Sequence, residues 1–127
     1  MTTRLALIFS LLILLLFNTN GIAQYSKLWD FAGGTIDGKN PQGSLTYDGT
    51  YLYGTTYQGG SSNYGMIFKI KPDGTGYTQL FSFAGTNSGI QPFYETLLLE
   101  GNFLYGMTTA GGIDGLGIIY KIQTDGT

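Results

Sequence analysis

The chain has 127 residues and a formal net charge of −2, with six Lys and Arg residues against eight Asp and Glu residues. It contains no His and no Cys, which removes the commonest general base, the commonest transition-metal ligand, thiol catalysis and disulfide bonds. The mildly acidic composition offers no basic surface, so we expect no nucleic-acid partner. We also expect no cofactor. The 21 glycines, 15% aromatic residues and 11% charged residues predict an all-β protein with many tight turns.

The chain begins with the layout of a secretory signal peptide. Arg4 precedes an apolar run at residues 5–17, and the small residues Gly21 and Ala23 stand at positions −3 and −1 of a cleavage site. The run is shorter than the about 20 apolar residues that a membrane helix needs, and no second apolar stretch follows it. We expect cleavage of residues 1–23 after Ala23, no membrane span in the remaining protein, and a secreted or cell-surface location. The alternative is an uncleaved membrane anchor.

The region after the signal peptide consists of two copies of one unit. The pattern Leu-Tyr-Gly-Thr-Thr at residues 52–56 returns as Leu-Tyr-Gly-Met-Thr at residues 104–108, an offset of 52 residues that holds without a gap. Repeat 1 covers about residues 25–76 and repeat 2 about residues 77–127. Other identities at the same offset are Tyr25 and Tyr77, Leu28 and Leu80, Phe31 and Phe83, Leu45 and Leu97, Ile67 and Ile119, and Lys69 and Lys121.

Each copy contains four extended segments that are rich in aromatic, β-branched or Leu residues and bounded by glycine-containing turns. In repeat 1 they lie at residues 44–48, 51–56, 66–70 and 77–83. The short links between the first and second and between the third and fourth segments predict antiparallel pairing. The expected fold is therefore two tandem four-stranded antiparallel sheets, consistent with two β-propeller blades in a partial propeller. A β-solenoid is the alternative, although a solenoid usually has a shorter period.

One stretch carries a family resemblance. Residues 53–70 read Tyr-Gly-Thr-Thr-Tyr-Gln-Gly-Gly-Ser-Ser-Asn-Tyr-Gly-Met-Ile-Phe-Lys-Ile, and Asp-Gly-Thr follows at residues 73–75. This order resembles the GloVer tandem repeat of exported bacterial proteins. The resemblance implies many propeller-like tandem repeats, a secreted or surface location, variable carboxy-terminal anchors and no established activity. Repeat 2 departs from repeat 1 at Met107 and Tyr120, and both of these residues are compatible with strands.

The repeat region begins with a segment of the kind that is missing at its end. Residues 25–31 resemble the fourth segment of a unit, whereas repeat 2 ends at the turn of residues 125–127, where that segment would begin. The simplest interpretation is the front part of a longer repeat protein. If the chain is complete, the alternative is a homo-oligomer in which residues 25–31 complete the last sheet of a neighbouring subunit. Three copies would then close a six-bladed ring, within the range of about four to eight blades.

Neither catalytic nor metal-binding residues are predicted. Residues 33–40 have the spacing of a phosphate-binding loop but lack its terminal Ser or Thr, and a proline follows. Asp73 and Asp125 recur in Asp-Gly-Thr turns and are expected to cap those turns rather than bind Ca²⁺. Glu95 and Glu100 have no matching pair of carboxyl groups in repeat 1, which disfavours a glycosidase.

The aromatic residues near the long links are the one indication of a ligand. The links at residues 57–65 and 32–43, with their counterparts in repeat 2, are expected on one rim of the sheets, and binding residues often lie on such loops. The candidates for ligand contact are Tyr57, Gln58, Asn63 and Tyr64, with a glycan or a surface protein as the partner. The alternative is that these residues only cover the edge of the sheet.

The function that these observations favour is an exported, non-catalytic repeat scaffold for extracellular binding or interaction. One alternative is part of a propeller enzyme, a hydrolase or an oxidoreductase, whose site lies in blades outside this chain. The other is a structural filler of the cell surface.

Overall fold

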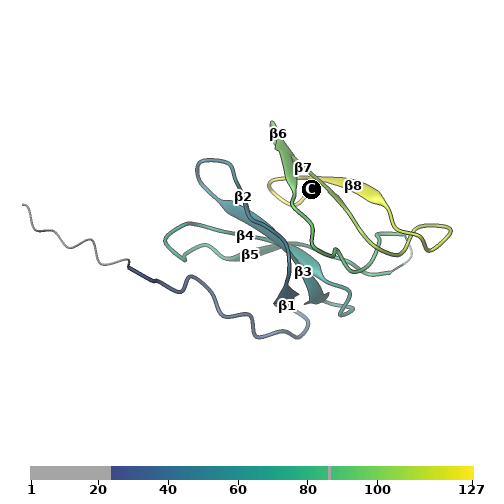
Figure 1. Ribbon diagram of the computed structural model, residues 1–127, viewed down its shortest axis with the longest axis horizontal. Coiled ribbons are helices and arrows are strands. Elements are labelled where there is room, and N and C mark those ends of the chain that lie inside the picture. The colour runs from purple at the N-terminus through teal and green to yellow at the C-terminus, as the bar shows by residue number, and fades with distance from the viewer. Residues whose placement is uncertain (1–23, 86) are drawn as a thin grey trace, which may run out of the picture.

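The computed structural model describes residues 24–85 and 87–127, and the expected signal peptide lies outside the described residues. The described part is all-β, which confirms the predicted fold class (Figure 1). Its strands are β1 (Gly38–Pro41), β2 (Thr46–Tyr47), β3 (Leu52–Gly59), β4 (Met66–Ile70), β5 (Thr78–Ser82), β6 (Leu98–Glu100), β7 (Phe103–Met107) and β8 (Ile119–Gln123). This part of the chain has no helix long and apolar enough to cross a membrane.

The strands form two antiparallel sheets. The first has the order β1-β3-β4-β5, with β2 also paired to β3, and the second has the order β6-β7-β8. The first sheet therefore has five strands instead of the expected four, because β3 continues to Gly59 and its second half pairs with β1. In this pairing Lys39 lies opposite Gln58, and Pro41 lies opposite Thr56. The second sheet has three described strands, and none of them corresponds to β5.

Residues 25–31 extend along the first sheet without pairing to it. Within the described chain, no backbone hydrogen bond joins these residues to another segment, although their sequence predicts a strand. Trp29 stacks on Tyr77 with ring centroids 4.0 Å apart, and Phe31 packs edge-on against Phe68 at 5.2 Å. Side-chain packing therefore holds the segment against the face of the first sheet that points away from the second sheet (Figure 1).

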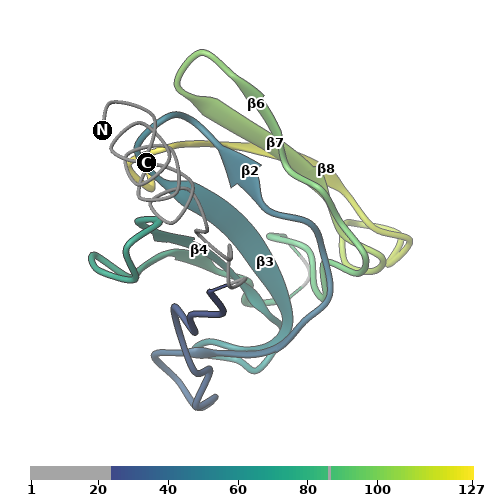
Figure 2. The same ribbon diagram turned by 60° about the vertical axis from the view of Figure 1, so that its left-hand side comes forward.

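The main core lies between the two sheets (Figure 2). Tyr53 and Ile67 of the first sheet contribute one side of it, and Leu104 of the second sheet contributes the other. Alternate residues of a strand point to opposite faces, so the neighbouring residues of β4 form a second, smaller cluster on the outer face of the first sheet. Each fully buried side chain of this size stabilises the fold by about 1.5–3 kcal/mol.

The two sequence repeats also repeat contacts in space. The ammonium group of Lys69 lies 4.8 Å from the ring centroid of Tyr51, and that of Lys121 lies 4.6 Å from the ring centroid of Phe103. Both residues of the second pair follow those of the first by 52 positions. The duplication found in the sequence therefore corresponds to two similar sheets.

Candidate functional site

Three long links meet at one end of the two sheets, where β3, β5 and β7 finish (Figure 2). The backbone N–H of Gln91 donates to the carbonyl of Tyr64 at 2.8 Å, and the hydroxyl of Thr109 donates to the carbonyl of Gln91 at 2.9 Å. These bonds tie the three links together, so we call this end the loop rim. The loop rim comprises residues 60–65, 83–85, 87–97 and 108–118.

The two amide side chains predicted to contact a ligand take part in bonds within the fold. Gln58 lies inside β3, and its Oε1 accepts a hydrogen bond from the side chain of Asn40 at 2.8 Å. The side-chain oxygen of Asn63 accepts the backbone N–H of Gly59 at 3.0 Å, which closes the turn after β3. Contact of Gln58 and Asn63 with a ligand stays a prediction, and these bonds give both residues a structural role.

The two predicted tyrosines lie in different surroundings. Tyr57 is half-buried in β3 and packs edge-on against Phe93, with ring centroids 5.3 Å apart. Tyr64 is exposed and lines a hollow of about 260 Å³ together with Gly85 and Ile90. The structure therefore does not bring the four predicted residues together at one hollow.

The most exposed aromatic pair of the loop rim, Phe93 and Tyr94, was not predicted from the sequence. Phe93 is 42% exposed and Tyr94 is 71% exposed, and their ring centroids lie 4.1 Å apart. Both residues line a hollow of about 320 Å³ between the 83–97 link and the end of β7. The signal available in the sequence was two adjacent aromatic residues within a link, at positions without an aromatic counterpart in repeat 1.

The backbone beside this aromatic pair is strained. Tyr94 has a φ of 50° and Gln91 a φ of 57°, in the left-handed region that large side chains rarely occupy. Such residues cost of order 1–3 kcal/mol each and tend to occur at functional sites. The fold therefore presents the Phe93 and Tyr94 rings to solvent at a cost in local stability.

Glu95 forms a buried polar wall of the same hollow. Its two carboxylate oxygens accept hydrogen bonds from the backbone N–H of Met107 and, at 2.8 Å, from the hydroxyl of Tyr120. Burial raises the pKa of the Glu95 carboxyl above its ordinary value, although both hydrogen bonds act in the opposite direction. Burial and the Glu95 carboxylate also raise the pKa of Tyr120. The side chain thus positions Tyr120 and the end of β7 below the hollow.

A second buried carboxyl group, Asp37, fastens residues 25–31 to the first sheet. It accepts hydrogen bonds from the backbone N–H of Ala32 at 2.8 Å, the N–H of Gly38 at 2.7 Å and the hydroxyl of Tyr77 at 2.6 Å. Burial alone would raise the pKa of Asp37, but these hydrogen bonds, with a longer one from Trp29, together lower it. Asp37 is therefore a structural anion at neutral pH.

Comparison with known families decides where the chain belongs. The model of the Gloeobacter/Verrucomicrobia repeat matches residues 15–127. The chain belongs to this repeat family. The match confirms the resemblance drawn from residues 53–75. Neither a curated protein nor a solved structure matches the chain.

Two carboxylates of this repeat protein, those of Asp73 and Asp125, accept hydrogen bonds within their own turns. Asp73 accepts the N–H and the hydroxyl of Thr75 at 2.9 and 2.7 Å, and Asp125 accepts those of Thr127 at 3.0 and 2.8 Å. The expectation that these residues cap their own turns is confirmed. Over residues 24–85 and 87–127, no group of three or more His, Cys, Asp or Glu side chains is placed to hold a metal ion.

Proposed function

We propose that this chain is an exported, non-catalytic repeat scaffold that binds a ligand at the loop rim. Membership of the repeat family and the two similar sheets support the scaffold. The observation that carries the binding site is the exposed Phe93 and Tyr94 pair, held on strained backbone beside a hollow of about 320 Å³. Loops on a rigid scaffold are a common place for binding residues.

The sheets are, in this proposal, blades of a β-propeller. Strands β2 to β5 form an antiparallel meander of four strands in chain order, and the first sheet packs face to face on the second. Propeller blades have this meander and bury their faces against neighbouring blades. The loop rim then forms one end of the propeller, where ligands have access to several blades.

A neutral glycan is the ligand class that fits the hollow beside Tyr94. Aromatic rings offer flat apolar surfaces on which sugar rings stack, and the exposed Thr96 places a hydroxyl group nearby. The hydroxyls of Thr108 and Thr109 also line the hollow but already donate to the carbonyls of Ala110 and Gln91. The lining contains no Lys or Arg, which disfavours an anionic ligand. The small volume favours one or two sugar units over a protein surface.

Replacement of Tyr94 by Ala is expected to weaken glycan binding at least about tenfold, which corresponds to about 1.4 kcal/mol. The measurement is binding of the purified protein to an array of oligosaccharides from plant and bacterial cell walls, followed by titration of each hit. Tyr47→Ala is the matched control, because Tyr47 is an exposed tyrosine on β2, away from the loop rim. Absence of any hit, or equal weakening by both substitutions, would contradict the proposal.

Export is supported by the signal-peptide layout of residues 1–23. Expression of the complete chain in a bacterial host is expected to yield a product outside the cytoplasm whose first residue is Gln24. Intact mass and amino-terminal sequencing measure this directly. A product that stays in the cytoplasm with residues 1–23 attached would contradict export, and it would leave the proposed glycan site unaffected.

A further inference from the structure

The second sheet has an unpaired edge, and the chain carries an unpaired segment whose sequence fits that edge. Among the described strands, β8 pairs only with β7, whereas its counterpart β4 pairs with both β3 and β5. Residues 25–31 precede residues 77–83, which contain β5, by the repeat offset of 52 positions. They thus have the sequence of a fourth strand but no strand partner within the described chain.

This segment occupies the place that a fourth strand takes against the next sheet. Phe31 packs on Phe68 with ring centroids 5.2 Å apart and an interplanar angle of 69°. Their counterparts, Phe83 after β5 and Tyr120 in the second sheet, are 5.3 Å apart at 66°. The segment therefore lies against the first sheet as the end of the first sheet lies against the second.

A backbone contact repeats in the same way. A methyl group added to Gly74 would lie 3.1 Å from the carbonyl oxygen of Leu28, and one added to Gly126 would lie 3.1 Å from that of Leu80. Residues 25–31 are thus positioned as the last strand of a further sheet stacked on the first. Among the described strands, all belong to the first or second sheet, and none is available to form the other three strands of that further sheet.

The outer face of each sheet corresponds, by the repeat offset, to the face that the other sheet buries in the contact between the two sheets. Ile119, on the outer face of the second sheet, is 80% exposed, whereas its counterpart Ile67 is buried between the sheets. On the outer face of the first sheet, Leu45 is exposed, and its counterpart Leu97 is buried between the sheets. Each outer face therefore displays residues whose counterparts are covered inside.

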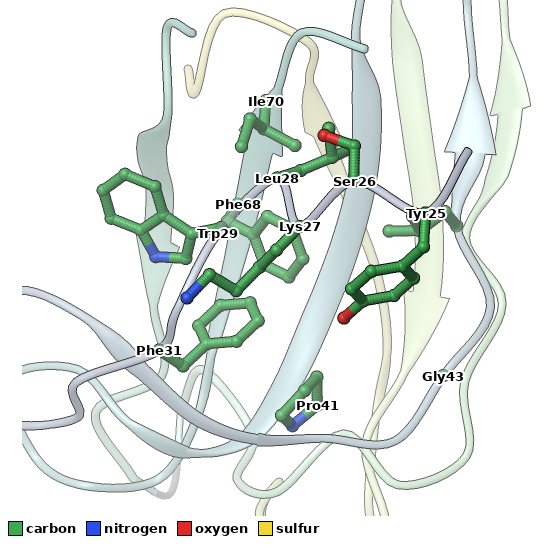
Figure 3. A pocket seen from close by; sticks show the side chains of 11 residues that line it. Tyr25, Ser26, Lys27, Leu28, Trp29, Phe31, Pro41, Gly43, Phe68 and Ile70 are labelled. Carbon is green, nitrogen blue, oxygen red and sulfur yellow. The ribbon is translucent and has the colours of Figure 1, made fainter. Parts of the chain in front are cut away.

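The outer face of the first sheet is also hollowed. Figure 3 shows the side chains of Leu28, Phe31, Phe68 and Ile70 around a groove of about 480 Å³. Apolar side chains form most of its lining, and Leu45 is one of them. The groove is large enough to accept side chains from another sheet.

Differences between the repeats make the two outer faces complementary in size. On the outer face of the second sheet, Leu98 and Met107 stand where the first sheet has the smaller residues Thr46 and Thr55. On the hollowed face, Gly43 stands where the second sheet has Glu95, and Phe68 replaces Tyr120. Larger apolar side chains on one face are thus matched by a roomier and more apolar surface on the other.

We propose that a second copy of this chain docks head to tail, with its residues 25–31 pairing antiparallel to β8. The pairing of β4 with β5 sets Ile67 opposite Phe81 and Lys69 opposite Thr78. Transferred by the repeat offset, this register places Trp29 of one copy opposite Ile119 of the next.

The same register places Ser26 of one copy opposite Lys121 of the next. Such a contact is heterologous, so it closes into a ring when the rotation between copies allows. Rings of two to four copies have about four to eight sheets, the range of known propellers. The assembly is independent of glycan binding at the loop rim.

Sedimentation of the purified processed protein tests the assembly. The wild type is expected to sediment at a whole multiple of the chain mass, and Ile119→Lys is expected to sediment as a monomer because it buries a charge in the contact. Ile113→Lys is the matched control, since Ile113 is 96% exposed on the loop rim and outside the contact. A monomeric wild type, or equal dissociation by both substitutions, would overturn the proposal.

A disulfide between two different single-cysteine variants tests the register. The native chain has no Cys, so Ser26→Cys mixed with Lys121→Cys can form a mixed disulfide only between copies. Under mild oxidation this pair is expected to give mostly the mixed dimer. Ser26→Cys mixed with Ile113→Cys, on the loop rim at the opposite end of the second sheet, is expected to give little. Equal yields from the two mixtures would overturn the register.

Discussion

Replacement of Phe83 by Ala is expected to lower the free energy of unfolding by about 3–5 kcal/mol. The Phe83 side chain is 0% exposed in the core between the two sheets and packs on Tyr120 at 5.3 Å. Removal of the ring leaves a cavity that neither sheet can close without moving as a whole. Since domains are stable by only about 5–15 kcal/mol, the variant is expected to lie close to its unfolding threshold.

The repeat supplies the control for this substitution. Phe31 makes the equivalent contact with Phe68, but it is only half-buried, so Phe31→Ala is expected to cost about half as much. Both variants are measured by urea denaturation, followed by circular dichroism, in the Ile119→Lys background so that association does not contribute. Equal losses would show that the space between the sheets is not the main core.

Replacement of Gly65 by Ala is expected to cost about 3 kcal/mol or more. Gly65 has a φ of 93°, and a methyl group there would lie 2.2 Å from the carbonyl oxygen of Thr56. The backbone must therefore shift, which breaks the bonds of Gly65 with Gly59 and Phe83, each 3.0 Å long. A hydrogen bond contributes about 1 kcal/mol, and the left-handed conformation adds about 1–2 kcal/mol for a residue with a side chain.

Gly49→Ala separates the steric part of this effect from the conformational part. Gly49 has a φ of 98°, similar to that of Gly65, but no atom lies within 4 Å of an added methyl group. Its replacement is expected to cost about 1–2 kcal/mol. The thermal unfolding midpoints of the two variants give the comparison. Equal shifts would mean that the turn after β3 adjusts without losing its bonds to the rest of the loop rim.

The repeat pattern carried most of the fold prediction. The segment at residues 66–70 coincides with β4, and that at residues 77–83 contains β5, because both have turn glycines at their boundaries and β-forming residues between them. β1 was not predicted, since Gly38–Pro41 contains Gly, Asn and Pro, which normally indicate a loop. Its pairing depends on the distant second half of β3, which has no local signal.

The candidate site was harder to predict than the fold. Tyr64 was expected at the rim and lies there, because its link is long and follows a strand. Phe93 and Tyr94 were missed, since an aromatic pair in a link is equally compatible with a buried position. Their exposure depends on the backbone conformation at Gln91 and Tyr94, which both have a positive φ although neither is a glycine, so the sequence does not indicate it. Non-local packing decides both features.

Determination of the structure of the purified processed protein at atomic resolution tests the central claim most directly. We expect copies arranged head to tail, with the backbone of residues 25–31 of one copy hydrogen-bonded to β8 of the next and Trp29 opposite Ile119. The loop rims of all copies would then face the same end of the ring. Isolated chains in which residues 25–31 remain unpaired, or copies related by a symmetric two-fold contact, would contradict the account.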